Sequence, residues 1–311
     1  MSCCRTLFAA ALLLCAWPSA ALAQAPPTAP VVLTVPISAR TAALGNAWVA
    51  GRDQDVIFAN PAQLIGVRTD FSLSMVRLGP SAHGASMTSA YAGGKLSFTL
   101  GWGVQVLSFS APGGQVPPYN ADQLLSRPAT DGMRTASDAQ SAVATVGAAI
   151  QYKGFKIGAA GKYAADRQDA NQHAFLVDLG LARNLFGGVA AIAAQNLGHG
   201  SLTGLPFARL PRQVAVGWST AKPAGPLDLT LFTQVTHRSG WTSPAAGLEA
   251  GYSWIEGYSV TLRAGARRPD TTAERPIALG AAFTADRLTL EYALRFFDNN
   301  RYAHMVTIRW R

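Results

Sequence analysis

The chain of 311 residues has a formal net charge of +9, yet only 14% of its residues are charged, against about 25% in soluble domains. After residue 23 no apolar run approaches the roughly 20 residues that a membrane helix needs, which excludes a helical membrane protein. A low charge fraction with 30 glycines favours strands in a membrane instead, with a soluble β-sandwich as the alternative.

Residues 1–23 predict a secretory signal peptide. Arg5 precedes an apolar run over residues 7–17, and Ala21-Leu22-Ala23 forms a small-x-small cleavage site. A lipoprotein signal ending at Cys15 is the less favoured alternative, because a leucine precedes that cysteine. Cleavage after residue 23 removes all three cysteines, so we expect no disulfide and no cysteine metal site in the mature chain.

Export also limits which partners the net positive charge can attract. An exported protein seldom meets nucleic acid, so we expect no nucleic-acid partner. Outer-membrane lipid and lipopolysaccharide, or an anionic amphipathic ligand, match a basic chain better.

Residues 24–68 predict a periplasmic leader followed by a plug or hatch segment. Residues 24–36, rich in Pro and Ala, are typical of a flexible leader. Residues 38–49 predict a short helix capped by Ser38, and the Asn-Pro pair that follows marks a turn. In a barrel such a segment has to lie in the lumen or beneath the periplasmic mouth. The residues expected to form the plug or gate are Arg40, Leu44, Gly45, Trp48, Asn60 and Pro61.

Residues 69–311 alternate apolar and polar side chains in segments of about ten residues. Over 288–296, for example, leucine and aromatic side chains share one face, while Thr289, Glu291 and Arg295 share the other. Side chains of a strand point to opposite faces in turn, and a tilted membrane strand needs about this length. We predict an all-β transmembrane antiparallel barrel of about fourteen strands, over 69–78, 84–92, 95–109, 139–152, 155–165, 173–185, 188–196, 212–220, 227–237, 244–253, 258–267, 276–285, 288–297 and 302–311.

The connections between these strands sort by length, as in outer-membrane barrels, where periplasmic turns are short and outer loops longer. The predicted inner turns are Gly93-Gly94, Lys153-Gly154, Phe186-Gly187, Ala221–Pro226, Trp254–Gly257 and Asp286-Arg287. The predicted outer loops include Ser110–Asp138, Leu197–Pro211, Arg238–Ser243 and Arg268–Arg275. A soluble sandwich has no reason to sort its loops in this way, so the pattern favours the membrane barrel.

Several short motifs, taken in order, carry a family resemblance. The run from Ser38 to Ala47 followed by Asn60-Pro61-Ala62 resembles the N-terminal signature of PorV/PorQ-type outer-membrane proteins, which are similar to FadL-like fatty-acid transporters. Later motifs that resemble the family are Val177–Leu181, Ala194–Gly198, Leu210–Arg212, Leu248–Tyr252, Leu262–Gly265 and Tyr292–Leu294 with His304. The resemblance implies a fourteen-stranded barrel in the bacterial outer membrane with an N-terminal plug. The chain departs from common barrels at Arg311, where a terminal aromatic residue is expected.

Charged side chains gather on the face that the register turns inward. They are Lys156, Lys162, Asp178, Asp228, Glu249, Arg263, Arg267, Glu291, Arg295 and Arg309. On the lipid face each basic residue would cost about 2–4 kcal/mol at the midplane. Two interpretations stay open: the basic residues bind an anionic head group, with Arg263 and Arg295 as first candidates, or the charges pair across neighbouring strands and fill a narrow lumen.

Aromatic residues near strand ends predict girdles at the two membrane interfaces. They are Trp102, Trp218, Trp241, Trp254, Trp310, Tyr252 and Tyr258. Trp48 is the exception, because it belongs to the plug-like segment, where it either packs against the barrel wall or touches a ligand.

No motif indicates an enzyme, a metal or a cofactor. The five histidines lack metal-ligand spacing, and neither a GxSxG elbow nor a phosphate or dinucleotide loop is present. A Ser-His pair without a local motif, such as Ser141 with His173, is the remaining route to an enzyme.

The family resemblance implies one of two roles for a non-enzymatic barrel. The first is uptake of hydrophobic or amphipathic small molecules, gated by residues 38–62. The alternative is a PorV-type accessory role in type IX protein secretion, in which the outer loops 110–138 and 197–211 dock exported cargo. We favour the first as the broader expectation.

Overall fold

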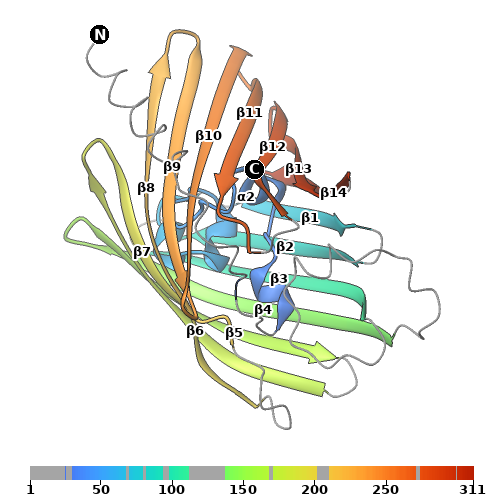
Figure 1. Ribbon diagram of the computed structural model, residues 1–311. Helices are drawn as coiled ribbons and strands as arrows, with labels where there is room; N and C mark the ends of the chain where they lie inside the picture. The colour runs from blue at the N-terminus through green and yellow to red at the C-terminus, as the bar shows by residue number, and fades with distance from the viewer. Residues whose placement is uncertain are drawn as a thin grey trace.

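The computed structural model describes residue 25 and residues 30–67, 70–79, 82–93, 98–111, 137–167, 171–201, 210–270, 274–298 and 300–311. The predicted signal peptide lies outside the described residues. The chain forms a closed antiparallel barrel in which every strand pairs with its sequence neighbours and β1 closes on β14 (Figure 1). No helix in the described part is long and apolar enough to cross a membrane.

The fourteen strands confirm the predicted number. They are β1 Asp70–Leu78, β2 Ala82–Ala92, β3 Phe98–Ala111, β4 Ser137–Tyr152, β5 Phe155–Arg167, β6 Asn171–Leu185, β7 Gly188–Ser201, β8 Gln213–Ala224, β9 Leu227–Arg238, β10 Trp241–Ile255, β11 Tyr258–Arg267, β12 Glu274–Ala285, β13 Leu288–Phe297 and β14 Arg301–Trp310. Each lies within a few residues of its predicted range.

The predicted short turns are largely confirmed. Lys153-Gly154 and Phe186-Gly187 have positive φ at both residues, and Asp286 opens the β12–β13 turn with φ 51°. Left-handed pairs of this kind suit two-residue hairpins, because their twist matches that of the strands. The turn predicted at Trp254–Gly257 narrows to the two residues after β10, and Gly94 lies outside the described residues.

Two predicted connections are shorter than expected. The loop expected at Arg238–Ser243 is a two-residue turn, Ser239-Gly240, with φ of 48° and 85°. The turn expected at Ala221–Pro226 is shorter as well, because β8 continues through Pro223 to Ala224. Residues 221–228 are exposed on both faces of this hairpin, whose turn lies at the top of Figure 1. Asp228 is therefore exposed and does not face a closed lumen.

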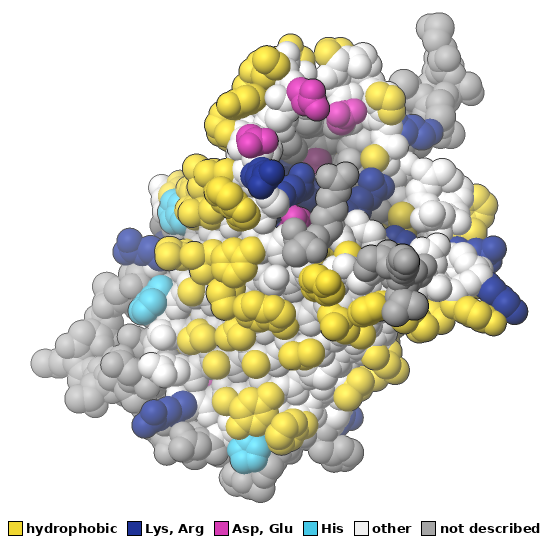
Figure 2. Space-filling view, turned by 180° about the vertical axis from the view of Figure 1, so that it is seen from behind, with side chains coloured by type: hydrophobic (Ala, Val, Ile, Leu, Met, Phe, Trp, Pro, Cys, Tyr) yellow, Lys and Arg dark blue, Asp and Glu magenta, His cyan; other side chains and the backbone are white. Residues whose placement is uncertain are grey.

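The alternation of side chains between the two faces is confirmed. In β13, Leu288, Leu290 and Tyr292 are exposed, while Thr289 and Glu291 are buried. Figure 2 shows hydrophobic side chains in rows over the outer face, whereas charged side chains gather around a hollow at one end of the barrel. This outer face is the apolar band that a membrane barrel presents to lipid.

The predicted aromatic girdle holds for six of its seven members. Trp102, Trp254, Trp310, Tyr252 and Tyr258 are exposed on the outer face, and Trp218 is half-buried among outward valines of β8. Trp241 is the correction. It follows the β9–β10 turn, shares the inward face of β10 with Ala245 and Glu249, and is buried.

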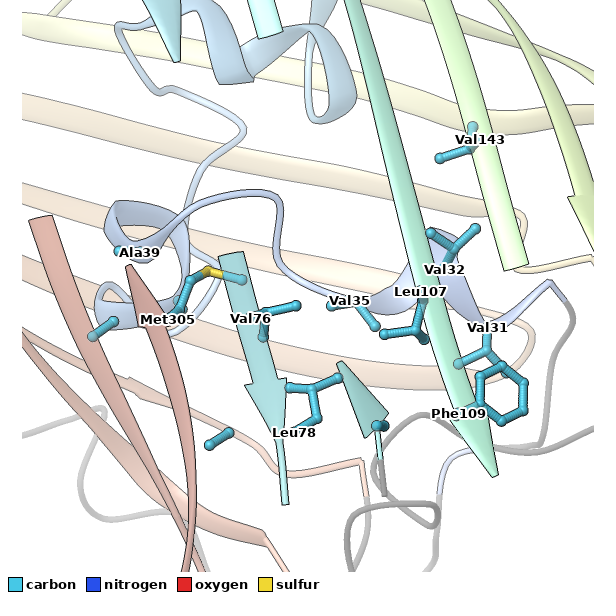
Figure 3. Packing of buried hydrophobic residues seen from close by; sticks show 14 of the residues in the cluster. Val31, Val32, Val35, Ala39, Val76, Leu78, Leu107, Phe109, Val143 and Met305 are labelled. Atoms are coloured by element: carbon cyan, nitrogen blue, oxygen red, sulfur yellow. The ribbon is translucent and has the colours of Figure 1, made fainter. Parts of the chain in front are cut away.

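The core of the barrel is filled by the N-terminal segment, residues 30–67. It contains the 3-10 helices η1 Val31–Thr34, η2 Gln54–Phe58 and η3 Pro61–Leu64, and the helix α2 Ala39–Ala43. Figure 3 shows Val31, Val32 and Val35 packed beside Leu107 and Phe109 of β3. Their burial means that residues 31–35 do not form the flexible leader that their composition predicted; apolar contacts with the inner wall outweigh the Pro-rich context.

Candidate functional site

Backbone contacts with the inner wall position the N-terminal segment. Ser86 Oγ donates to the carbonyl of Ile37 at 2.6 Å, and the Ala39 amide donates to Thr307 Oγ1 at 2.8 Å. Ser38 caps α2 as predicted, since its Oγ accepts from the Thr41 amide at 3.4 Å.

The helix α2 ends where the chain enters the left-handed region at Gly45, with φ +63°. A Cβ at this glycine would lie 3.0 Å from the Ala266 carbonyl of β11, so glycine permits the close approach. The preceding Leu44 is fully buried, against Gly247 of β10.

The predicted turn at Asn60-Pro61 closes the second half of the segment. Asn60 Oδ1 accepts from the Ala62 amide at 3.1 Å, and its Nδ2 donates to the Val49 carbonyl at 3.0 Å. Pro61 occupies the first position of η3, where its missing N–H is not needed. Gly180 of β6 leaves room for this turn, because a Cβ there would lie 1.9 Å from Asn60 Oδ1.

Seven charged side chains, of which six are buried and Arg40 is half-buried, join the segment to the wall, and we call them the inner network. They are Arg40, Asp53 and Asp55 of the segment, and Glu249, Arg263, Glu291 and Arg309 of the wall. Arg40 Nη2 lies 2.6 Å from Glu249 Oε2, and Arg263 Nε lies 2.7 Å from Glu249 Oε1.

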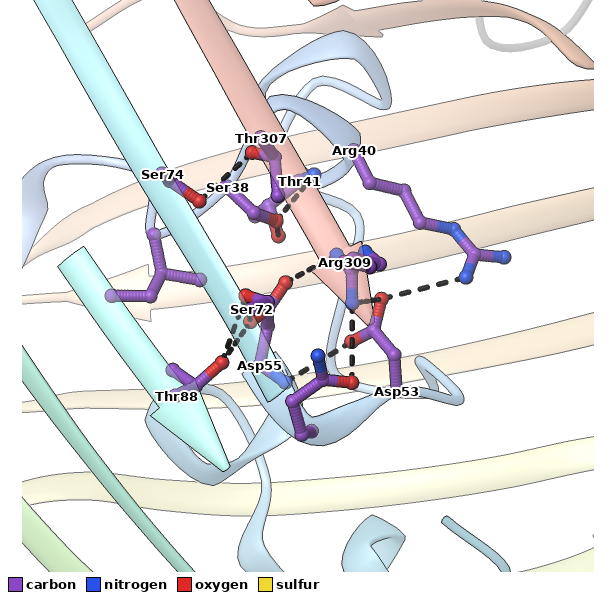
Figure 4. Close-up of polar contacts among 12 residues, drawn as sticks. Ser38, Arg40, Thr41, Asp53, Asp55, Ser72, Ser74, Thr88, Thr307 and Arg309 are labelled. Carbon is purple, nitrogen blue, oxygen red and sulfur yellow. Dashed lines mark hydrogen bonds and ion pairs between the residues drawn. The ribbon is translucent and has the colours of Figure 1, made fainter. Parts of the chain in front are cut away.

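Arg309 of β14 is the hub of the inner network. Its guanidinium pairs with Asp55, lies 3.0 Å from Asp53 Oδ2, and lies 3.2 Å from Glu291 Oε1. Figure 4 shows the contacts of Arg309 with Asp53 and Asp55, together with Thr88 and Ser72, which donate to Asp55. Three arginines thus face four buried carboxylates, and three of the seven groups belong to the segment.

Burial and pairing act in opposite directions on the charges of the segment. Burial raises the pKa of Asp53 to about 6, although Arg309 and Arg40 oppose the shift. Burial also favours a higher pKa for Asp55, but the Arg309 charge and the Thr88 hydrogen bond outweigh burial and hold the pKa of Asp55 below its usual value. Glu249 raises the pKa of Arg40 despite desolvation. At neutral pH these groups are ionised, so the segment is held by ion pairs.

A second alternating series, the outer chain, lies toward the predicted outer end of the lumen. Asp270 Oδ2 lies 3.0 Å from Arg238 Nη2 and 3.2 Å from Arg267 Nη1. Arg267 Nη2 lies 2.6 Å from Glu274 Oε2, and Glu274 also pairs with Arg295. The series of five begins and ends with an arginine.

The remaining predicted lumenal charges also point inward. Lys162 Nζ lies 2.5 Å from Asp178 Oδ2, and Lys156 donates to the Ile65 carbonyl at 3.1 Å. Arg263 and Arg295, the first candidates for an anionic ligand, both form ion pairs within the protein. Of the two interpretations of the lumenal charges, pairing between neighbouring strands describes what these side chains do here.

A cavity of about 140 Å³ remains on the outer side of the N-terminal segment. One part of its lining is apolar, with Leu33, Val35 and Ile37 of the segment. The other part is polar, with Gln213 and Gln234 of the wall. Further lining residues are Trp48, Phe58, Arg238, Trp241, Arg267 and Asp270.

Arg238, Asp270 and Trp241 are among the lining residues that sequence reasoning missed. Arg238 and Asp270 lay in segments read as outer loops, and Trp241 was assigned to a girdle. The signal that could have found Trp241 is its even spacing from Ala245 and Glu249, because residues separated by an even number share one face of a strand.

Trp48 packs against the barrel wall, while bordering the cavity. Its ring lies 5.3 Å from that of Phe232, and the Arg40 guanidinium lies 4.8 Å from its centroid.

Ser141 and His173 do not form a catalytic pair. Ser141 is buried on the inward face, where its Oγ accepts from the Val32 amide at 3.4 Å. His173 lies on the exposed outer face and stacks on Tyr163. Within the described ranges, no group of His, Cys, Asp or Glu is arranged to hold a metal ion. The loops 110–138 and 197–211 lie largely outside the described residues, so their docking role stays a prediction.

Comparison with known proteins gives a fold match. No family model matches the chain, and no curated protein matches it. The structure is similar to that of the Pseudomonas putida toluene transporter TodX, with a TM-score of 0.58 and 11% identity over 88% of this chain and 96% of that chain. It is also similar to a TodX ΔS2S3 mutant described as a monoaromatic hydrocarbon channel, with a TM-score of 0.55 and 11% identity over 88% and 96% of the two chains. At this identity the likeness concerns the fold alone.

Proposed function

We propose that this barrel lies in the bacterial outer membrane and takes up small hydrophobic or amphipathic molecules, with residues 38–62 as the gate. The observation that carries the proposal is the lumen itself. The N-terminal segment packs inside it and borders a cavity of about 140 Å³ on the predicted outer side. A concave, partly apolar site with a few polar groups is the kind of site that binds a small ligand.

Contacts of two kinds attach the segment to the wall. In the first kind the segment lies close against small residues: a Cβ on Gly158 would lie 2.4 Å from Ala62 N, and one on Gly265 would lie 2.3 Å from Gly45 N. The second kind is the inner network, whose ion pairs join Arg40, Asp53 and Asp55 to the wall. Opening of the gate requires these ion pairs and the apolar contacts of the segment to break.

The fold match agrees with this assignment, because two similar structures are described as a toluene transporter and a monoaromatic hydrocarbon channel. The ring of such a molecule has the right size for this cavity: a cavity of about 150 Å³ holds benzene.

Deletion of residues 38–62 tests the gate. We expect a folded barrel, recognised by its mobility shift on boiling, whose liposomes swell faster in small sugars than those of the intact protein. Unchanged swelling rates for a correctly folded deletion variant would refute the gate, since the lumen would then be closed by something other than this segment.

A further inference from the structure

The outer end of the cavity contains two polar groups that the protein leaves without a partner. Arg238 and Trp241 face each other across the β9–β10 turn as a register pair. Both are buried, and both line the cavity. Within the described part of the chain, Arg238 Nε and Trp241 Nε1 have no hydrogen-bond partner. Both atoms are donors and neither can accept.

Unpartnered buried donors are costly. Each leaves the desolvation of an N–H group uncompensated, and native proteins retain few of them. Two on adjacent side chains of one cavity wall indicate a missing acceptor that both share. A carboxylate presents two oxygens and can accept from both donors, whereas a hydrocarbon can accept from neither.

The charge around the pair also favours an anion. Asp270 engages Arg238 through Nη2 and leaves its Nε unoccupied. The same carboxylate oxygen serves Arg267 as well, so Asp270 is shared between two guanidinium groups. Arg268 adds a further cation, with its guanidinium 3.7 Å from the Trp241 ring centroid.

The opposite lining supplies the apolar half of the site. Leu33, Val35 and Ile37 border the cavity from the N-terminal segment, and Phe58 and Ala245 complete this lining. The volume of about 140 Å³ is close to that of a cavity known to hold a benzene ring. It is too small for a long alkyl chain.

We propose that the cavity binds small aromatic monocarboxylates, with the ring against the apolar lining and the carboxylate accepting from Arg238 Nε and Trp241 Nε1. This inference rests on the proposed uptake function and names its substrate class. It separates this barrel from a channel for neutral hydrocarbons, because the two donors gain a partner only from an acceptor-bearing ligand.

Binding to the full chain in detergent tests the proposal, with three probes measured by titration calorimetry. Benzoate carries both features, toluene carries the ring alone, and acetate carries the charge alone. We expect benzoate to bind at least tenfold more tightly than either of the others. Arg238→Gln should weaken benzoate about tenfold, because a charge-assisted hydrogen bond is lost, and should leave toluene unchanged. Trp241→Phe should weaken benzoate by a smaller factor.

Arg275→Gln is the matched control. This arginine also lies near the outer end, but it is exposed and lies 3.8 Å from its partner Asp298, so benzoate affinity should not change. The boiling shift checks that each variant is folded, and Trp241→Phe remains as a test if Arg238→Gln does not fold. Equal affinity for toluene and benzoate would overturn the proposal of an aromatic monocarboxylate, and so would a benzoate affinity that neither substitution changes. Either result would still be consistent with uptake of hydrocarbons. Failure of the uptake function itself would show as no uptake of either molecule by cells.

Discussion

The strongest structural prediction concerns Arg309, the hub of the inner network. Its guanidinium is 2% exposed and faces Asp53, Asp55 and Glu291. Arg309→Met keeps an unbranched chain but leaves four buried carboxylates with two arginines. Removing one partner of a buried ion pair costs about 3–5 kcal/mol, so we expect the free energy of unfolding to fall by about that amount.

The assay is urea unfolding from lipid vesicles, followed by tryptophan fluorescence. Limited trypsin digestion reports on the segment separately, because a loosened segment exposes Arg40 to cleavage. The matched control is Arg311→Met, two residues further on. Its side chain is 53% exposed and its Nε lies 3.8 Å from Asp70 Oδ2, so the loss should stay below about 1 kcal/mol. If the two variants unfold alike and resist trypsin equally, the inner network does not hold the segment.

Two further predictions concern the same segment. Burial raises the pKa of Asp53 from 3.8 to about 6. Ionising Asp53 therefore lowers the free energy of unfolding, and this loss disappears as the pH falls from about 6 to about 4 and the carboxylate is protonated. Asn at this position does not titrate. The free energy of unfolding of Asp53→Asn, measured relative to wild type by urea unfolding, should therefore be greater at pH 8 than at pH 4, by up to about 3 kcal/mol. If the free-energy difference between variant and wild type does not change with pH, the raised pKa of Asp53 is contradicted. Gly180→Ala would place a Cβ 1.9 Å from Asn60 Oδ1 and should cost about 1–3 kcal/mol by overpacking. The control Gly161→Ala meets nothing within 4 Å, and equal unfolding midpoints for the two variants would refute the close approach.

Much of the wall could be read from the sequence because strand periodicity is local. Lipid-facing and inward-facing side chains alternate in polarity along a strand, as in β13. A few adjacent residues therefore predict both that a strand is present and which face each side chain takes. The ends of the strands are harder. Ser239-Gly240 closes a tight turn through positive φ values, and the polar residues around it resembled a longer loop.

The site was less accessible to sequence reasoning because its contacts join distant positions. Arg40 and Glu249 are separated by 209 residues in the chain, and no local sequence pattern predicts that they pair. The inward direction of Arg263 and Arg295 was predictable, but their partners depend on the register of neighbouring strands. Residues 31–35 were misread for a similar reason, since their burial depends on β3 and β4.

The central claim is that this barrel admits small hydrophobic or amphipathic molecules across the outer membrane. The most direct test is the initial rate at which intact bacterial cells lacking their own FadL-like barrels take up radiolabelled toluene and benzoate, with and without this chain. We expect faster, saturable entry of toluene, benzoate or both when the chain is present in the outer membrane. Equal rates in both strains, with the folded barrel recovered from the outer membrane, would contradict it.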